Sequence, residues 1–149
     1  MGSISLDNPA VQSYFFYSAV LALKLLGMAF LTARQRFVKK VFANPEDAAG
    51  GGKVKLDDPD VERVRRAHLN DLENIPVFWL LGALYLTTGP SAALATNLFR
   101  AVAAGRILHT FVYAVKPLPQ PTRFITFAVP LLIVNFMGVK VVLHYLSAL

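Results

Sequence analysis

Long apolar stretches alternate with shorter polar segments along this chain of 149 residues. The first apolar stretch covers about residues 11–33 and is interrupted only by Lys24, and the others cover residues 75–89, 92–115 and 124–146. A helix that crosses a membrane needs roughly 20 mostly apolar residues. The first and last stretches meet this length outright. The middle two meet it only if their charges face other protein or lie near the membrane surface.

We therefore predict an all-α fold, an integral membrane four-helix bundle in one domain that covers residues 1–149. The polar segment at about residues 41–59 contains two prolines and three consecutive glycines, which favour a loop over a helix. Asp58 followed by Pro59 is a typical helix start, and Thr122 is the expected N-cap of the last helix. The helices are expected at about residues 10–40, 60–88, 92–115 and 122–147.

Composition supports the membrane class. Hydrophobic residues make up 55% of the chain, charged residues only 16%, and the mean hydropathy is +0.49. Soluble domains carry about a quarter charged residues. The net charge of +6 could suit a nucleic acid, but the basic residues gather beside the apolar stretches. Lipid headgroups are therefore the simpler partner, and no nucleic acid is expected.

The placement of basic residues predicts an orientation in the membrane. Nine of the 15 lysines and arginines lie in residues 34–66, and Lys116 and Arg123 lie between the third and fourth stretches. The positive-inside rule then places these loops in the cytosol and both termini on the opposite side. The chain has no cysteine, so any thiol in its chemistry must come from another molecule.

Polar residues in the middle stretches fall on defined helix faces. Successive residues of an α-helix are rotated by about 100°. In the second helix this rotation separates one stripe from Arg65, His68 and Asp71, which point elsewhere. In the third helix it places Arg106, His109 and Tyr113 together, with Arg100 on another face. The stripe of the second helix consists of Glu62, Arg66, Asn70 and Glu73.

Charges at membrane depth are costly and normally face protein or water. One interpretation is that Glu62, Arg66 and Glu73 form ion pairs that hold the helices together. However, Arg36 and Arg123 at adjacent helix ends add further donors at the same level, and such an excess favours an anionic ligand. Glutathione is one ligand that would match, because arginines suit its carboxylates, a glutamate its ammonium and an asparagine its amides. Composition alone does not single it out.

Three long motifs carry a family resemblance. They are "VFANPEDA" at residues 41–48, "VERVRRAHLNDLEN" at 61–74 and "GRILHTFVYAVKPLPQPTR" at 105–123. Together they resemble the MAPEG family, the membrane-associated proteins of eicosanoid and glutathione metabolism. The resemblance implies a four-helix protomer, a homotrimer, and glutathione sites at the subunit interfaces near the cytosolic face. It also implies the endoplasmic reticulum membrane as the location, with luminal termini, and the mitochondrial outer membrane as a second location.

The same resemblance implies the site residues. Arg123 is expected to be catalytic by stabilising the glutathione thiolate. Asp47 corresponds to an aspartate that assists catalysis in one branch of the family, and its alternative role is to cap the loop after Pro45. The residues expected to bind glutathione are Arg36, Arg66, Asn70, Glu73, His109, Tyr113 and Arg123.

Three positions favour the transferase branch of the family. Leu69, Phe124 and Phe127 stand where the prostaglandin E synthase branch has polar residues. We therefore expect a membrane-bound glutathione transferase that conjugates glutathione to lipophilic electrophiles and reduces lipid hydroperoxides. The alternatives are a glutathione-dependent prostaglandin E or leukotriene C synthase, and a non-catalytic membrane scaffold or regulator. Pro76 lies one residue earlier than in the family pattern and is expected to kink the second helix.

The remaining polar residues receive simpler interpretations. His68 and Asp71 are expected in helix packing or headgroup contacts. Lys24 is expected to extend toward the membrane surface or to meet a partner at a subunit interface. His144 is expected to be solvated. The three histidines are scattered and lack the spacing of metal ligands, so no metal is expected.

Overall fold

The structure, a computed structural model, describes residues 5–146. Four long helices dominate it, and the predicted all-α bundle is confirmed. The third long helix passes directly into a π-helical segment, η1, at Phe111–Val115. The long helices are α1 (Pro9–Lys39), α3 (Pro59–Thr87), α4 (Ala92–Thr110) and α5 (Thr122–Tyr145).

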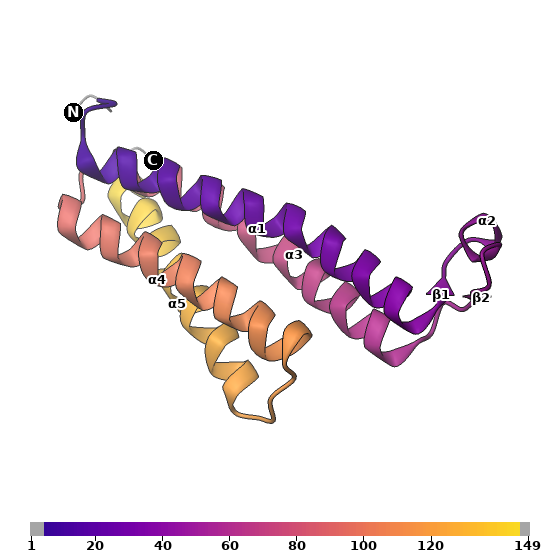
Figure 1. Cartoon of the computed structure of the whole chain (residues 1–149). Coiled ribbons are helices and arrows are strands. Elements are labelled where there is room, and N and C mark those ends of the chain that lie inside the picture. Colours follow the sequence, from indigo (N-terminus) through magenta and orange to yellow (C-terminus); the bar gives the residue numbers. More distant parts are fainter. Residues whose placement is uncertain (1–4, 147–149) are drawn as a thin grey trace.

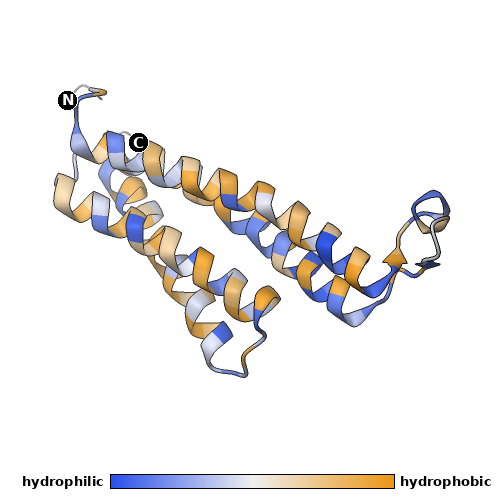
Figure 2. Cartoon of the chain, in the orientation of Figure 1, coloured by the Kyte–Doolittle hydropathy of each residue, from blue (hydrophilic) through white to orange (hydrophobic). Residues whose placement is uncertain are grey.

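Three segments are long and apolar enough to cross a membrane. They are α1, α4 together with η1, and α5. The mean hydropathy over 18 residues is 1.8 in α1, 1.3 in α4 with η1, and 2.0 in α5. The helix α3 does not meet that measure, because its first half is charged, as the blue positions near the loop show (Figure 2). Of these 18 residues, only 11% in α1 and 17% in α5 are buried within the chain. The apolar sides of these helices are therefore left for lipid or for other protein.

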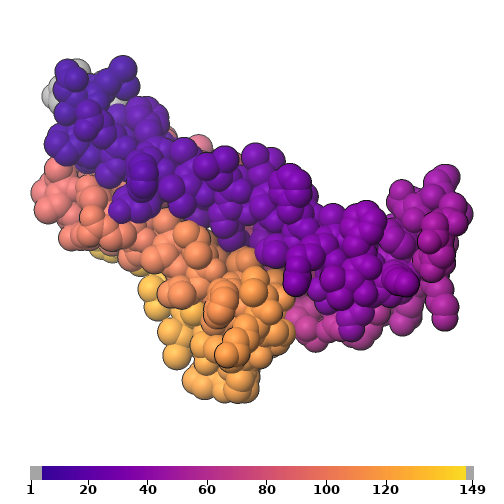
Figure 3. Space-filling view, in the orientation of Figure 1, coloured from indigo at the N-terminus to yellow at the C-terminus, as the bar shows by residue number. Residues whose placement is uncertain are grey.

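The helices form two antiparallel pairs (Figure 1). The helix α1 runs along α3 and α4, and α5 runs along α3 and α4. Toward one end the two pairs diverge, so that the α4–α5 connection projects away from the far end of α1 and α3 (Figures 1 and 3). The beginning of α1 and the end of α5 lie together at the other end (Figure 1).

The predicted N-cap is confirmed for α3 but not for α5. Asp58 accepts hydrogen bonds from the backbone N–H groups of Asp60 and Val61, with Pro59 as the first helical residue, which confirms this predicted start. The N-cap prediction for Thr122 is wrong. Thr122 is itself the first residue of α5. Instead, Oε1 of Gln120 accepts a hydrogen bond from the N–H of Phe124 at 3.1 Å.

The polar segment between α1 and α3 is more ordered than the predicted loop. It contains the strand β1 (Val41–Phe42), the one-turn helix α2 (Pro45–Ala48) and the strand β2 (Lys53–Val54), and the strands pair in parallel. Lys40 ends α1 in the left-handed region with φ of 52°. The Lys39 ammonium beside Asp60 ties this end of α1 to α3 and holds the pKa of that carboxyl below its usual range.

Aromatic and close backbone contacts fix the bundle. The rings of Tyr14 and Phe78 both meet Phe99, with centroids 5.6 Å and 5.9 Å apart. Where α4 crosses α5, Gly105 lies directly against the ring of Pro130, and a Cβ at residue 105 would collide with it. The helix α3 continues without interruption through Pro76 from Pro59 to Thr87. These contacts fix the relative positions of α3 and α4 along the bundle axis, and so determine which of their polar residues meet.

Candidate functional site

A pocket of about 320 Å³ opens where α3, the end of α4, η1 and the start of α5 come together. We call it the tyrosine pocket. It combines two arginines, a glutamate, two amide side chains, a histidine and a tyrosine with three apolar side chains. Its lining residues are Arg66, Leu69, Asn70, Glu73, His109, Tyr113, Gln120, Arg123, Phe124 and Phe127.

Tyr113 and Arg123 form a stacked pair in this pocket. The Arg123 guanidinium carbon lies 4.7 Å from the centre of the Tyr113 ring, within the range of a cation–π contact. Tyr113 belongs to the π-helical segment η1, whose wider turn changes the direction of side chains relative to a continuous α-helix. Such segments are frequent at functional sites. The contact holds a cation at the pocket, and Arg123 has no ion-pair partner among residues 5–146.

His109 packs against Tyr113 of this pair. Only 3% of its surface is exposed. Its Nδ1 lies 3.2 Å from Oγ1 of Thr126, which in turn donates to backbone carbonyls one turn earlier in α5. The imidazole ring is 5.5 Å from the Tyr113 ring and 6.0 Å from the Phe127 ring. His109 is therefore held by contacts with Thr126, Tyr113 and Phe127.

Asn70 is oriented by a buried cluster of charges behind the pocket. The Nη2 of Arg106 donates to Oδ1 of Asn70 at 2.7 Å and to Oδ1 of Asp71 at 2.6 Å. Because the amide oxygen of Asn70 is taken, its NH₂ group is left to donate into the tyrosine pocket. The other Asp71 oxygen pairs with Lys24 and accepts a weak hydrogen bond from Thr110 at 3.4 Å.

This cluster corrects the prediction for Lys24. Lys24 neither extends toward the membrane surface nor waits for another subunit, because it pairs with Asp71 of the same chain. Asp71 has no exposed surface and Arg106 only 2%, so Asp71 packs between helices, as expected, but with full charge compensation from α1 and α4. The signal in the sequence was two charges inside apolar stretches, Lys24 and Arg106, and an aspartate just before another, for which mutual pairing is the least costly arrangement.

Arg66 and Glu73 have no ion-pair partner within residues 5–146. The alternative interpretation of their stripe required pairing between its own members. Instead, Glu62 accepts from Arg65 at 2.7 Å, a residue that the rotation placed off the stripe. Both a cation and an anion therefore remain available beside the pocket.

Arg36 and Asp47 lie outside the tyrosine pocket. Arg36 lines a second hollow of about 570 Å³ along α1 and α3, the arginine groove, together with Arg66 and His68. Its Nη1 is buried and has no hydrogen-bond partner in the described part of the chain. Arg36 and Asp47 also share a smaller pocket beside the loop. Asp47 accepts a hydrogen bond from the Asn44 side chain at 3.2 Å, a contact within the loop.

Two participants were not among the predicted site residues. Gln120 lines the tyrosine pocket from the proline-rich connection, and Arg106 orients Asn70. The helix rotation had placed Arg106 on the same face as His109 and Tyr113, so the sequence did indicate that Arg106 lies near the site. Nothing in the sequence indicated a role for Gln120. Within residues 5–146, no three potential metal-ligating side chains gather in one place.

Taken together, the fold and the pocket define a helical membrane protein with a polar, partly cationic site between α3, α4 and α5. Comparison with known protein families matches residues 14–143 to the MAPEG family. The chain is 46% identical over 131 residues to microsomal glutathione S-transferase 1 of Mus musculus and 43% identical over 131 residues to that of Homo sapiens, covering 83% of each chain. It is 40% identical over 127 residues to prostaglandin E synthase of Homo sapiens, covering 84% of this chain and 83% of that one. The chain therefore belongs to the MAPEG family.

Proposed function

We propose that this protein is a membrane-bound glutathione transferase, which conjugates glutathione to lipophilic electrophiles and reduces lipid hydroperoxides. The observation that carries the proposal is the Arg123–Tyr113 pair, which places a cation beside Asn70, Glu73 and Arg66 with no ion pair to a carboxylate in the described part of the chain. The relatives named microsomal glutathione S-transferase 1 support it at 43% and 46% identity.

Glutathione fits the side chains of the tyrosine pocket group by group. The carboxylates suit arginines, so Arg66, and Arg36 from the groove of a neighbouring protomer, would hold them through paired hydrogen bonds. The ammonium suits Glu73. The NH₂ of Asn70, whose oxygen is bound by Arg106, would donate to a carbonyl of the peptide. The thiol is then left for Arg123 and Tyr113, with His109 as support.

The chemistry requires a thiolate. An ordinary cysteine thiol has a pKa of about 8.5, and a neighbouring guanidinium lowers the pKa by stabilising the sulfur anion. In conjugation the sulfur forms a bond to the electrophilic carbon as the leaving group departs with the bonding electrons. In peroxide reduction the sulfur attacks the O–O bond and releases an alcohol, and a second glutathione converts the sulfenic acid to the disulfide and water. The protein contributes proximity and electrostatic stabilisation, with no covalent enzyme intermediate.

The separation of Arg36 from the tyrosine pocket supports a homotrimeric assembly. In this proposal the arginine groove of one protomer faces the tyrosine pocket of the next, so that Arg36 and Arg123 of two chains meet at one glutathione. Arg36 lines the arginine groove, where its guanidinium would supply the positive charge for a carboxylate. Asp47 lies next to Arg36 and would assist from the same side.

We further propose that the chain is a single domain of the endoplasmic reticulum membrane, with the mitochondrial outer membrane as a second location. Its charged loops face the cytosol and its termini the lumen, because the basic residues of 34–66 lie at one end of the bundle. A tag inserted at Gly51 should be digested by protease in intact microsomes, while a C-terminal tag is protected. The reverse pattern would overturn the orientation.

The decisive experiment follows thiolate formation. Purified protein mixed with glutathione should give the ultraviolet difference absorbance of a thiolate and should conjugate a halonitroarene. The variant Arg123→Ala should lose both signals by at least tenfold, as expected from removal of one stabilising charge, whereas the control Arg100→Ala should keep them, because Arg100 bonds Tyr17 away from the pocket. If no thiolate forms, or if Arg123→Ala retains full turnover, the proposal is wrong.

Prostaglandin E synthesis is the second candidate, favoured by the 40% identity to relatives of that name. The tyrosine pocket argues for the transferase, since Phe124 and Phe127 line it where polar residues are expected in a prostaglandin synthase. Parallel assays with an electrophile, a lipid hydroperoxide and the prostaglandin endoperoxide separate the two. Turnover of the endoperoxide alone would reverse the assignment.

A further inference from the structure

One polar side chain of the tyrosine pocket, Gln120, has no part in the function proposed above. It belongs to the connection between η1 and α5, where prolines stand on both sides of it, at residues 119 and 121. A proline restricts its own backbone and that of the residue before it. The connection is also tied back to η1, because the N–H of Leu118 donates to the carbonyl of Val112 at 3.0 Å. Gln120 therefore lies on a restricted segment at the edge of the pocket.

The first turn of α5 orients the amide group of Gln120. Its Oε1 accepts a hydrogen bond from the N–H of Phe124 at 3.1 Å. A backbone N–H can only donate, so the oxygen of the amide and not its nitrogen must face Phe124. The NH₂ group has no acceptor within residues 5–146. It is therefore left to donate into the tyrosine pocket, which Gln120 lines.

This hydrogen bond also extends the positive end of α5. The first N–H groups of a helix carry a partial positive charge, and α5 has 24 residues. The Gln120 amide accepts from one of these groups and donates outward, so it adds one more aligned dipole to the helix. Hydrogen bonds in such a chain strengthen one another. An NH₂ group in this position favours an anion as its acceptor.

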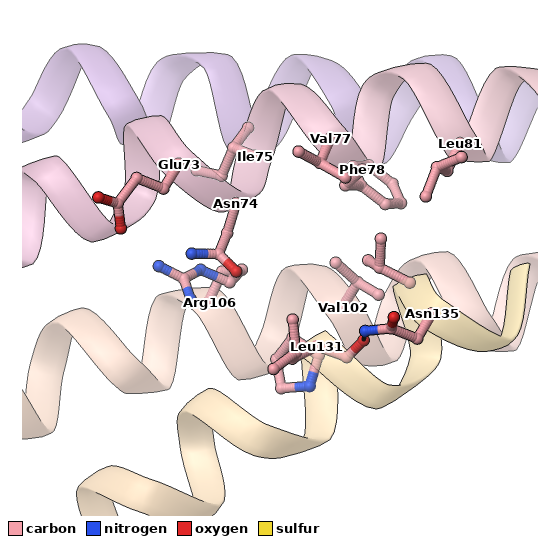
Figure 4. Close-up of a pocket in the computed structure, with 12 residues that line it drawn as sticks. Glu73, Asn74, Ile75, Val77, Phe78, Leu81, Val102, Arg106, Leu131 and Asn135 are labelled. Carbon is pink, nitrogen blue, oxygen red and sulfur yellow. Dashed lines mark hydrogen bonds between the residues drawn. The ribbon is translucent and has the colours of Figure 1, made fainter. Parts of the chain in front are cut away.

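The inner end of the tyrosine pocket suits the peptide part of glutathione. Glu73 lies beside Asn74 and Arg106 between α3 and α4 (Figure 4), and Arg106 holds the side-chain oxygen of Asn70. In the proposed arrangement Glu73 binds the ammonium and Asn70 a carbonyl. These groups of glutathione therefore lie on the α3 side and have their own partners.

Gln120 lies at the end of the pocket where the thiol is expected. Arg123 and Phe124 follow it by three and four residues in the first turn of α5, and the Arg123 guanidinium lies 4.7 Å from the centre of the Tyr113 ring. Phe127 adds another apolar side chain. A sulfur anion in such partly apolar surroundings has little water around it, so each N–H donor stabilises it more than in water.

We infer that Gln120 is a second hydrogen-bond donor to the glutathione thiolate, next to Arg123. The thiol proton is released to water, the NH₂ group donates to the sulfur anion, and the amide oxygen keeps its bond to the N–H of Phe124. Gln120 stays neutral throughout. The inference rests on the proposed function for its ligand, and it adds a catalytic residue to the site.

The test replaces the amide and titrates the bound thiol. Gln120 is exposed, so Gln120→Met, which has a similar length but no N–H donor, should fold. With glutathione bound, the pH at the midpoint of thiolate absorbance should rise by about one unit, because a hydrogen bond to a charged atom is lost. The matched control Gln12→Met makes the same change at an exposed residue near the start of α1. It should titrate with the parent protein.

Two further measurements separate the donor from the helix cap. S-Methylglutathione keeps the peptide of glutathione but cannot form a thiolate, so Gln120→Met should bind it as tightly as the parent protein does. The variant Gln120→Glu keeps an oxygen for the N–H of Phe124 and lacks the NH₂ group. It should melt with the parent protein, while its thiolate midpoint rises at least as far as that of Gln120→Met, since a carboxylate also repels the sulfur anion.

The outcomes distinguish this inference from the proposed function. If the parent protein forms a thiolate and Gln120→Met or Gln120→Glu titrates like it, Gln120 is no donor to the sulfur and the transferase stands. If Gln120→Met loses affinity for S-methylglutathione as well, Gln120 serves the peptide or the helix cap, and the inference is again wrong. If the parent protein forms no thiolate, the proposed function fails and this inference fails with it.

Discussion

Asp71 is a fully buried carboxylate that contacts two cations, Lys24 and Arg106. The substitution Asp71→Asn removes its charge and leaves both cations buried. Breaking such a pair destabilises a protein by about 3–5 kcal/mol, so the variant should unfold at a clearly lower temperature in detergent. The control Asp57→Asn, at a side chain that is 87% exposed, should unfold with the parent protein. Equal melting of all three proteins would contradict a stabilising role for the cluster.

Individual residues differ in how far the sequence predicted them. The rotation of 100° per residue placed Arg66, Asn70 and Glu73 on one face, and all three line the tyrosine pocket; their binding of glutathione stays a prediction. The pairing of Lys24 with Asp71 could not be predicted, because it depends on the relative heights of α1 and α3. Those heights are set by side-chain packing between segments far apart in the sequence.

The crossing of α4 and α5 depends on Gly105, whose Cα faces the ring of Pro130 at a distance too short for a side chain. Gly105→Ala should therefore separate the helices or strain them, at a cost of about 1–3 kcal/mol typical of overpacking. Gly27→Ala is the matched control, since a Cβ there meets nothing within 4 Å of it and alanine favours the helix by up to about 1 kcal/mol. Thermal unfolding of the two variants should move in opposite directions. If Gly27→Ala destabilised the protein as much as Gly105→Ala, the loss of stability would come from helix propensity or lipid contact and not from the crossing of α4 and α5.

At the level of elements, apolar length and turn chemistry were sufficient for the helical fold and for the start of α3. They missed the parallel pairing of β1 with β2, since each strand has only two residues and gives no periodic signal. They also missed η1, because a π-helical turn arises from packing rather than from local preference. The tyrosine pocket depends on that turn, so its detailed shape lay beyond the sequence.

The whole molecule places Arg36 and Arg123 in separate cavities of one chain, and the proposed trimer joins them across an interface. This arrangement predicts complementation between two defective chains. A chain with Arg36→Ala keeps its tyrosine pocket, and a chain with Arg123→Ala keeps its arginine groove. When both chains are co-expressed in equal amounts and assemble at random into rings with head-to-tail interfaces, about a quarter of the sites should combine an intact pocket with an intact groove.

Conjugation activity of the co-expressed pair should thus recover to about a quarter of the parent level, well above either variant alone. The control pairs Arg123→Ala with Glu73→Ala, two residues of the same tyrosine pocket. Every pocket in that mixture lacks one residue or the other, so its activity should stay at the level of the single variants. Recovery of activity in the control would mean that Glu73 and Arg123 act in sites of different protomers. If the pair of Arg36→Ala and Arg123→Ala chains does not recover activity, Arg36 and Arg123 belong to the site of one protomer. The main support for a site shared between subunits would then be lost.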